Sequence, residues 1–407
     1  MIDFELSGEQ LAWQKIARDF SEQEIRPIAE TLDRSENLLA DFPWEMVRRG
    51  SKLGLRTLSL PREYGGPDLD MLAWLVIIDE LGYADISCAK IFSQCWKLSR
   101  AIVNAGTQEQ KDRFLPAFRD DDTFLLTGAQ TEPESGSDSH LPYDAPNAGV
   151  RLSAVRVGDH YVLNGRKHFI SHAPVSKLLL VIARTDKMVG TSIGTRDFLV
   201  PRDTPGLTFG AVHDKVGFRI YLQGEINFDN VRVPIENLLG GQAAGPAYER
   251  VASNIELAAY AVVVARSALD ASIKHANEQM QDGGQSIQHL AVSTMIADMY
   301  KDLQAARTLL WRSTWMVVHN KADRSLTMSA KVFCTEVAVK ICVAALEIFG
   351  ESGVMRELPI QKYVRDALAM PHMDATNPIN KLKIAKFLEA WITEGPLPPW
   401  GRSTSRN

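Results

Sequence analysis

One short segment of the sequence concentrates the residue types that can hold a phosphate or a heterocycle. The segment TGAQTEPESGSD, residues 127–138, directly follows three apolar residues, 124–126. Thr131, Gly136 and Ser137 could present hydroxyl and backbone N–H groups to a ligand. Because glycine lacks a Cβ atom, the backbone at Gly136 could approach a ligand closely. The pattern alone favours a solvated loop, and only the other motifs of the chain shift the balance toward a ligand-binding surface.

The residues before this segment predict helices. Ser7, followed by Gln10 at the third helical position, is typical of a capped helix start. Residues 72–81 form an apolar run that ends at Gly82. We therefore expect an α-helical domain over residues 1–125.

The hydrophobic pattern changes to a period of two after this helical part. Residues 150–157, VRLSAVRV, alternate roughly, and the strand-like run 160–170 follows. Asn164-Gly165 within that run predicts a two-residue hairpin turn. The short runs LLLVIA, DFLV, GLTF and EINF continue the pattern with turn residues between them. We expect a central β-domain over residues 126–236.

Long helices are expected again from residue 237 to residue 407. Two apolar stripes step by three and four residues, as the buried face of a helix does. They consist of Val292, Ile296, Met299, Leu303, Ala306 and Leu310, and of Ala330, Phe333, Val337, Ile341, Ala344 and Ile348. These stripes predict a helical bundle, so the fold class is a multidomain α+β arrangement in the order helix, β, helix.

Composition excludes several classes of protein. The 407 residues are 45% hydrophobic and 23% charged, with a formal net charge of −5, which is typical of a soluble globular protein with two or three domains. A nucleic-acid partner is not expected, because no basic footprint is present. The apolar run 257–265 is far shorter than the roughly 20 residues of a membrane-spanning helix. Four cysteines without a CxxC pair, and no visible targeting signal, favour a cytoplasmic location.

Four motifs occur in a fixed order along the chain. They are TEPESGSD at 131–138, YVLNGRKHFIS at 161–171, KVGFR at 215–219 and FDNVRVPIENLLG at 228–240. In this order the sequence resembles the acyl-CoA dehydrogenase family, whose pattern has a TEP-x-A-G-S-D loop, an NG-x-K-x-x-I-[ST] strand and a V-R-V-P segment. The resemblance covers essentially the whole chain. It implies an N-terminal helical domain, a central β-barrel and a C-terminal four-helix bundle.

The resemblance also implies FAD, held between the barrel, the bundle and a neighbouring subunit. Thr131 would address the pyrimidine edge of the flavin, and Gly136 and Ser137 would lie along the cofactor phosphates. Ser171 would reach the flavin near N5. The resemblance further places two side chains beside the ring, for which plain barrel core is the alternative: Phe169 and Ile170.

A carboxylate is expected opposite the flavin, because removal of the α-proton of a thioester requires a positioned base while the β-hydride leaves to the cofactor. The family's base is often a Glu in E-G-T-x-x-I, and here the corresponding stretch begins with Asp374 and includes Thr376, an implied cofactor contact. Asp is one methylene shorter than Glu. Glu256 is the competing candidate, because the same helix supplies the base in some family members. We expect Glu256 to lie on a solvated helix face.

Two further segments bear on the cofactor and the substrate. The chain has EIFGESG where the family has Q-x-x-G-G-x-G, which implies cofactor contacts at Glu347 and Gly350. Residues 80–105 would line the acyl end of the substrate site. The bulky Phe92 and Trp96 there predict a short or compact cavity.

The resemblance therefore implies an FAD-dependent acyl-CoA dehydrogenase. The implied partners are an acyl-CoA substrate and an electron-transfer flavoprotein or similar acceptor, and the implied assembly is a homodimer or homotetramer with isologous interfaces. Two alternatives stay open: a non-catalytic subunit of a heteromeric dehydrogenase, and a flavin oxidase or monooxygenase of the same fold that acts on a non-thioester.

Overall fold

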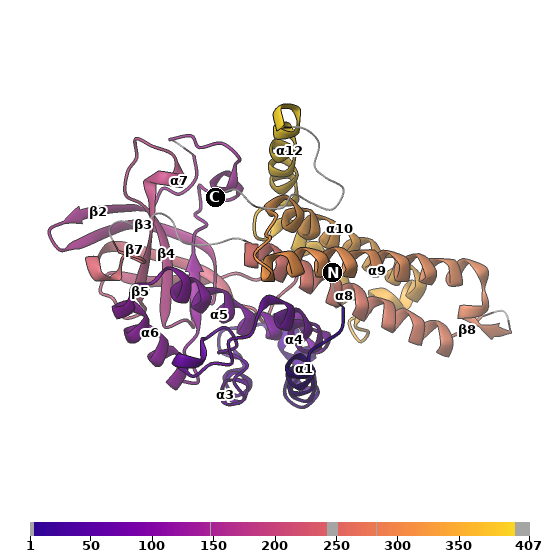
Figure 1. Ribbon diagram of the computed structural model, residues 1–407. Helices are drawn as coiled ribbons and strands as arrows, with labels where there is room; N and C mark the ends of the chain where they lie inside the picture. Colours follow the sequence, from indigo (N-terminus) through magenta and orange to yellow (C-terminus); the bar gives the residue numbers. More distant parts are fainter. Residues whose placement is uncertain (1–3, 147, 242–250, 282, 395–407) are drawn as a thin grey trace.

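The computed structural model describes residues 4–146, 148–241, 251–281 and 283–394. The chain folds into an N-terminal group of helices, a central sheet and a C-terminal group of long helices, in the predicted order (Figure 1). In Figure 1 the sheet and the long helices lie side by side, and the N-terminal helices run beneath both. None of the helices in the described ranges is long and apolar enough to cross a membrane.

The N-terminal helices begin where the sequence indicated. Ser7 accepts a hydrogen bond from the Gln10 backbone N–H at 3.2 Å, and the Gln10 side chain accepts one from the Ser7 N–H at 2.9 Å, so the predicted capped start is confirmed. The helices are α1 (Gly8–Phe20), α2 (Arg26–Asp33), α3 (Trp44–Lys52), α4 (Met71–Ala84), α5 (Ile86–Ala105) and α6 (Gln108–Asp120).

The central part is one curled seven-stranded sheet. Its strands are β1 (Leu126–Ala129), β2 (Ser153–Val157), β3 (His160–Ser171), β4 (Leu178–Arg184), β5 (Thr195–Pro201), β6 (Leu207–Val212) and β7 (Gln223–Pro234). The strand order is β1-β4-β2-β3-β7-β6, and β5 pairs with β4. A short helix, α7 (Thr191–Gly194), precedes β5. The face that β3, β4, β5 and β7 turn inward carries its own apolar core.

The predicted hairpin turn at Asn164-Gly165 is wrong. The antiparallel pair of β2 and β3 joins Val157 to His160, so the turn is at residues 158–159. Asn164 instead lies inside β3 at a shift in register, where its side chain accepts a hydrogen bond from the Asn230 backbone N–H at 2.8 Å. The Asn-Gly pair therefore forms a bulge, which is the other conformation that a glycine in a strand favours.

The C-terminal helices form the expected bundle. They are α8 (Val251–Glu278), α9 (Leu290–Val318), α10 (Arg324–Phe349), α11 (Ile360–Ala369) and α12 (Asn377–Glu394), with a small hairpin of β8 (Met280–Gln281) and β9 (Gly284–Gln285) after α8. The predicted stripes bury most of their members, including Leu303 and Ile341. Phe333 is the exposed member, at 39%, and four further members are half-buried: Val292, Ile296, Ala344 and Ile348.

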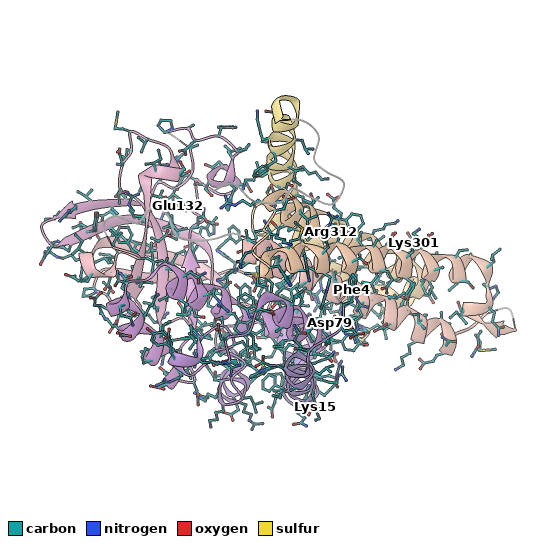
Figure 2. All side chains as sticks on the ribbon, viewed as in Figure 1. Phe4, Lys15, Asp79, Glu132, Lys301 and Arg312 are labelled. Atoms are coloured by element: carbon teal, nitrogen blue, oxygen red, sulfur yellow. The ribbon has the colours of Figure 1, made fainter. Side chains whose placement is uncertain are left out.

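The N-terminal and C-terminal helices share one continuous apolar core, with α4 packed against α8 and α9. At the edge of this interface Arg266 of α8 donates to Asp79 of α4, with 2.6 Å between Nη1 and Oδ2; Figure 2 labels Asp79 in this region. The helical parts therefore pack as one body.

A buried ammonium group joins all three parts of the chain. Lys362 of α11 lies 2.8 Å from an oxygen of Asp85, the residue between α4 and α5, and 2.6 Å from an oxygen of Asp366. Asp366 also accepts a hydrogen bond of 2.7 Å from the backbone N–H of Phe218, in the loop between β6 and β7. The loop approaches α11 so closely that a Cβ atom on Gly217 would lie 2.4 Å from the Arg365 carbonyl oxygen.

Candidate active site

A cavity of about 690 Å³ lies where the sheet, α5, α8 and the segment after α11 meet. Seven of the residues singled out from the sequence line it, although they come from three separate segments of the chain. They are Thr131, Gly136, Ser137, Phe169, Ile170, Ser171 and Asp374. The chemistry-bearing segments therefore converge on one site.

The loop at 131–138 is held to the sheet by a buried ion pair. Lys167 Nζ lies 2.7 Å from Glu132 Oε1, and both side chains are almost fully buried (Figure 2 labels Glu132). Lys167 also donates to the Gln130 carbonyl oxygen at 2.8 Å. Glu132 accepts from the backbone N–H groups of Arg151 and Leu152 at 2.7 and 2.9 Å. Burial lowers the pKa of Lys167 to about 8, and the attraction of Glu132 opposes that shift.

The sequence analysis assigned no role to the two residues of this ion pair. Glu132 and Lys167 are the Glu and the Lys of the two motifs quoted above, TEP and NG-x-K. Their presence in two motifs of one resemblance was a signal that they could be partners. The pair fixes the ligand-facing loop against β3, and thereby sets the position of the residues on either side of it.

Gly136 and Ser137 leave an open surface beside the segment after α11. The Ser137 hydroxyl accepts a hydrogen bond from the Thr376 backbone N–H at 3.3 Å and lies 3.4 Å from the Thr376 hydroxyl. A Cβ atom on Gly136 would meet no protein atom within 4 Å. The backbone here is therefore accessible to a ligand, and Thr376 lies at the edge of the same cradle.

The end of β3 turns one aromatic ring outward into the cavity. A shift in register between Lys167 and Ile170 gives Phe169 a φ of 54°, and the ring stacks on His168 with 4.4 Å between centroids. Phe169 is 50% exposed, so the alternative of plain core is wrong for this residue. Ile170 lines the cavity but is also buried in the core of the sheet, so both descriptions hold for it.

Asp374 reaches the cavity from a strained turn. The backbone has a positive φ at Asp374 (49°) and at Ala375 (63°), a region that residues with a Cβ atom rarely adopt. Lys331 of α10 holds the turn by donating to the Ala375 carbonyl oxygen at 2.9 Å and to Asn377 Oδ1 at 2.7 Å. The Asp374 carboxylate is exposed and lines the same cavity as Ser171.

Glu256 does not lie on a solvated helix face, so that expectation is wrong. Its side chain is only 4% exposed, and its Oε2 lies 3.0 Å from Lys90 Nζ and 3.1 Å from Lys97 Nζ. Ser93 donates a hydrogen bond to Oε1. Burial raises the pKa of Glu256, but the two ammonium groups outweigh that effect and lower the pKa to about 2. No local pattern indicated this burial, because both lysines come from α5, 166 and 159 residues earlier in the chain.

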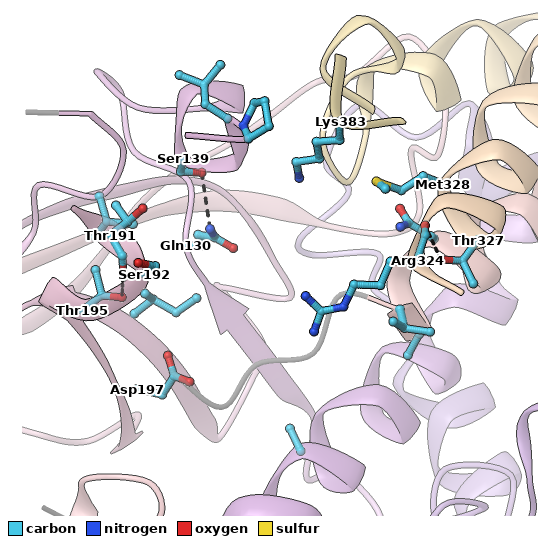
Figure 3. A pocket seen from close by; sticks show the side chains of 18 of the residues that line it. Gln130, Ser139, Thr191, Ser192, Thr195, Asp197, Arg324, Thr327, Met328 and Lys383 are labelled. Carbon is cyan, nitrogen blue, oxygen red and sulfur yellow. Dashed lines mark hydrogen bonds between the residues drawn. The ribbon is translucent and has the colours of Figure 1, made fainter. Parts of the chain in front are cut away.

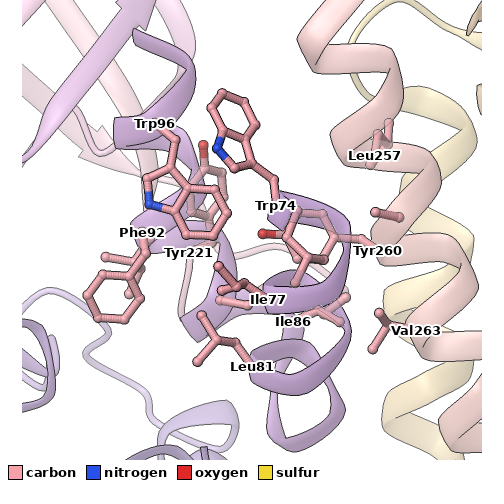
Figure 4. Packing of buried hydrophobic residues seen from close by; sticks show 14 of the residues in the cluster. Trp74, Ile77, Leu81, Ile86, Phe92, Trp96, Tyr221, Leu257, Tyr260 and Val263 are labelled. Carbon is pink, nitrogen blue, oxygen red and sulfur yellow. The ribbon is translucent and has the colours of Figure 1, made fainter. Parts of the chain in front are cut away.

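The bulky residues of α5 do not narrow the cavity. Trp96 donates its indole N–H to the Leu55 carbonyl oxygen at 2.6 Å and packs on Trp74 with 5.7 Å between ring centroids. Phe92 packs on Phe20. Figure 4 shows Phe92, Trp96 and Trp74 within the buried apolar cluster. The face of α5 that lines the cavity is polar instead, and its residues are Lys90, Gln94 and Lys97.

Glu347 and Gly350 are not brought to this cavity. Glu347 lies near the end of α10, Gly350 directly follows that helix, and both residues are exposed. Neither lines a described cavity. Their implied contact with a cofactor stays a prediction, and it would need a second copy of the chain.

A second cavity of about 1030 Å³ adjoins the first and shares Lys97 and Gln130 with it. Figure 3 shows Arg324 and Lys383 on the helical side of this cavity and Thr191 and Asp197 on the sheet side. The cations that line it within the described ranges are Lys97, Arg100, Arg324, Lys383 and Lys386. This cavity therefore provides a wide, basic space next to the candidate site.

Comparison with known proteins gives the family. The family models for the N-terminal, middle and C-terminal domains of acyl-CoA dehydrogenases match residues 7–121, 127–231 and 249–389, respectively. A probable acyl-CoA dehydrogenase of Bacillus subtilis, YngJ, is 33% identical over 95% of this chain and 100% of its own length. The chain belongs to the acyl-CoA dehydrogenase family.

Another relative and a solved structure match over almost the whole length. The 3-(aryl)acrylate reductase of Clostridium sporogenes is 33% identical over 92% of this chain and 97% of its own. The structure of butyryl-CoA dehydrogenase from Megasphaera elsdenii superimposes with a TM-score of 0.88 at 28% identity, over 95% of this chain and 100% of that one. This acyl-CoA dehydrogenase is accordingly an oxidoreductase that acts on CH–CH groups, and its cofactor is FAD.

The residues of the acyl-CoA dehydrogenase cavity fit FAD. Gly136 leaves its backbone open, the Phe169 ring offers an exposed face, and Thr131 and Ser137 offer hydroxyl groups. The Tyr221 hydroxyl, near Ser171, is buried and makes no hydrogen bond of good geometry to any described residue. A cradle with open backbone, an exposed ring and an unused donor is suited to a large polar heterocycle.

Proposed function

We propose that this protein introduces an α,β double bond into an acyl-CoA thioester, with Asp374 as the base. The observation that carries the proposal is the convergence of Asp374 with Thr131 and Ser171 on one cavity, although Asp374 lies more than 200 residues after either of them in the sequence. FAD, when bound, supplies the acceptor for the β-hydride. The chain itself supplies the base that takes the α-proton and the hydroxyl groups that orient the reacting molecules.

The position of Asp374 supports its assignment as base. A general base must be accessible to the proton that it removes and fixed in direction. Asp374 is exposed in the cavity. The turn that carries it has positive φ angles, and Lys331 holds this turn by a hydrogen bond to the Ala375 carbonyl oxygen.

Glu256 is the weaker candidate for the base. Both its oxygens are engaged by Lys90, Lys97 and Ser93, and it does not line the cavity. A carboxylate whose pKa is lowered to about 2 has little tendency to accept a proton at neutral pH. We assign it instead to the positioning of the two lysines.

We further propose that the protein works as a homodimer or homotetramer that passes electrons to an electron-transfer flavoprotein or a similar acceptor. Several large apolar side chains of the C-terminal helices are exposed, and a second copy of the chain would cover them. They are Phe333, Val343, Leu382, Phe387 and Leu388. The position of Glu347 and Gly350 outside the cavity is consistent with contacts to a cofactor in a partner subunit. Light scattering at micromolar concentration tests this, and a monomeric mass would contradict it.

Anaerobic mixing with a panel of acyl-CoA thioesters tests the reaction. We expect the flavin absorbance near ~450 nm to bleach with at least one thioester and to recover when an artificial or protein acceptor is added. A colourless protein would favour the non-catalytic subunit. Rapid recovery in air without another acceptor would favour an oxidase.

A further inference from the structure

The end of β3 that turns Phe169 into the candidate cavity is bulged against β7. His168 and Phe169 together lie opposite the single residue Glu225 of β7. On the other side of β7, residues 210–211 of β6 lie opposite the same residue, so both neighbouring strands bulge at one level. Bulges re-aim side chains, and here the bulge leaves Phe169 with a φ of 54°. A residue with a Cβ atom adopts that conformation at a cost in free energy, which other contacts must offset.

A single imidazole ring, that of His213 directly after β6, supplies several of these contacts. The Phe169 backbone N–H donates a hydrogen bond to His213 Nε2 at 3.3 Å. The two rings also pack together, with 4.5 Å between centroids, and the His168 ring lies 4.4 Å from each of them. His213 is itself fixed, because its backbone N–H donates to the Gln223 carbonyl oxygen at 2.8 Å. His213 therefore holds both the backbone and the ring of Phe169.

The hydrogen bond from Phe169 requires an unprotonated nitrogen on His213. A neutral imidazole has one acceptor nitrogen, whereas a protonated imidazole has two donors and no acceptor. Burial lowers the pKa of His213, the charges of His168 and Lys215 lower it further, and Glu225 opposes them. The neutral ring is therefore the main form at neutral pH, and acid converts it to the charged form. In that form an N–H group of the ring faces the N–H group of Phe169.

Charged groups from several elements surround this ring. His168 of β3 lies 3.7 Å from Glu225 of β7, measured between Nε2 and Oε1. On its other side His213 lines a cavity of about 720 Å³ between β6, the loop after α2 and the start of α11. The titratable and charged groups that line this cavity with it are Asp33, Arg34, Glu36, Asp214, Lys215, Arg219, Arg356 and Arg365. Several of them are paired with each other, as Arg365 is with Asp33.

We infer that His213 is a positioning residue of the cofactor site, which holds the Phe169 ring in the cavity while neutral and releases it when charged. The inference rests on the placement of Phe169 beside the flavin and not on the reaction. Only molecules with Phe169 in place bind FAD with full affinity, so its release weakens the apparent affinity in proportion to the fraction released. FAD binding should therefore depend on pH through a side chain that does not need to touch FAD.

The first experiment measures FAD binding without any substrate. Serial dilution of the FAD-loaded protein, followed by flavin fluorescence, gives the dissociation constant at about pH 8 and at about pH 5, the range in which histidine gains its charge. We expect the constant to rise about two- to tenfold in acid, the factor that one hydrogen bond of ordinary strength provides. The visible circular dichroism of the bound flavin should change over the same range. Free FAD in the same buffers is the reference.

The second experiment separates the acceptor from the charge. His213→Gln offers an amide oxygen that can accept the Phe169 N–H and does not titrate, so FAD should bind tightly at both pH values. His213→Leu has no acceptor and should bind FAD weakly at both. The matched control is His319→Gln, which replaces a histidine that stacks on Trp315 at the end of α9, and it should keep the pH dependence of the wild-type protein.

The third experiment moves the pH at which FAD affinity is lost. His168→Gln removes a group whose charge lowers the pKa of His213, so the loss should occur at higher pH. Glu225→Gln removes a carboxylate that raises this pKa, so the loss should occur at lower pH. A role of His213 in packing alone would not produce shifts of opposite sign.

The outcomes also separate this inference from the proposed function. Equal FAD affinity of the wild-type protein at both pH values would overturn the inference, and so would a wild-type pH dependence in His213→Gln. Unchanged FAD affinity in Phe169→Leu would remove Phe169 from the flavin site and overturn it as well. If the His213 variants do not fold, the wild-type pH dependence and its shifts in His168→Gln and Glu225→Gln decide. Failure of every thioester to reduce the flavin would contradict the dehydrogenase alone.

Discussion

Glu132 and Lys167, 35 residues apart in the sequence, form an ion pair that is almost completely buried, with 2.7 Å between Oε1 and Nζ. The pair ties the loop that carries Gly136 and Ser137 to the strand that carries Ser171. Two segments that face the same cavity are thus held at a fixed distance by side chains that do not need to touch a ligand.

Removal of one partner of this pair should destabilise the protein. Glu132→Gln leaves the Lys167 ammonium buried without a carboxylate, and loss of one partner of a buried pair costs about 3–5 kcal/mol. We expect a lower urea midpoint and weaker retention of FAD. Lys15→Met, which breaks an exposed ion pair, should lower the free energy of unfolding by less than about 1 kcal/mol and so move the midpoint little. Equal midpoints for the two variants would show that the buried pair does not hold the loop.

Gly136→Val should release FAD without unfolding the protein. A Cβ atom at this position meets no protein atom within 4 Å, so the chain itself has room for the side chain, whereas a closely approaching cofactor does not. The absorbance of bound flavin after gel filtration measures retention, and circular dichroism checks the fold. Glu134→Gln, two residues away and exposed, is the matched control. The same FAD content in both variants would remove this loop from the cofactor site.

Asp374→Asn should slow flavin reduction by roughly the 10²–10⁴-fold typical of a lost general base, because it keeps the shape of the side chain and removes its basicity. Substrate binding should change little. Stopped-flow mixing under anaerobic conditions separates the two steps. Asp374→Glu should keep activity if the shorter side chain is only a variant within the family, and lower it if the turn is built for Asp.

Glu256→Gln is not a suitable control for this series, because Glu256 is buried against two lysines and its loss would disturb the structure. The control must lie away from the site. Asp298→Asn, on the exposed surface of α9, is suitable and should leave the rate unchanged. A normal reduction rate in Asp374→Asn would mean that another group takes the α-proton.

Ala375→Gly should stabilise the protein. Ala375 has a φ of 63°, where a Cβ atom costs roughly 1–2 kcal/mol that glycine avoids. Glycine loses about 0.5–1 kcal/mol through the greater freedom of the unfolded chain, so a gain of up to about 1.5 kcal/mol remains. Urea unfolding measures it. Ala369→Gly, at the end of α11 with ordinary helical backbone, should have the opposite sign.

Stability should depend on pH through Glu256. Its pKa is about 2 in the folded protein and near 4.5 in the unfolded chain, so its contribution is complete above pH 4.5 and is lost as the pH falls through 2. The free energy of unfolding of the wild-type protein should fall relative to that of Glu256→Gln by about 2 kcal/mol between pH 6 and pH 3. A pH-independent difference between the two, in urea titrations, would mean that the lysines do not lower this pKa.

Much of the fold followed from local patterns. The capping box at Ser7, the change of period near residue 126 and the apolar stripe through Leu303 each depend on neighbours three or four residues away or on alternation along a strand. The hairpin turn predicted at Asn164-Gly165 was wrong, because an Asn-Gly pair suits both a turn and a bulge. Only the pairing of β2 with β3 distinguishes the two. The prediction that Phe333 is buried was wrong, because the apolar stripe of α10 extends beyond the face that the neighbouring helices cover.

Site residues could be predicted from the sequence where they belong to a motif. They could not be predicted where the site depends on contacts between segments that are far apart in the chain. Thr131, Ser171 and Asp374 came from motifs, and they do line one cavity. The burial of Glu256 depends on lysines about 160 residues earlier, which no local pattern connects to it. Trp96 marks α5 as bulky in the sequence, but its direction is set by packing against Trp74, and the opposite face of the helix meets the cavity.

The bridge from Lys362 to Asp85 and Asp366 limits how this protein can be divided or recombined. Its members come from different parts of the chain, and Asp366 in addition holds the Phe218 backbone, so no one part contains a complete set of partners. A fragment cut at either end of the sheet would carry buried charges without their counterparts. Chimeras with relatives should therefore fold only when Asp85, the loop at Phe218 and α11 are exchanged as one unit.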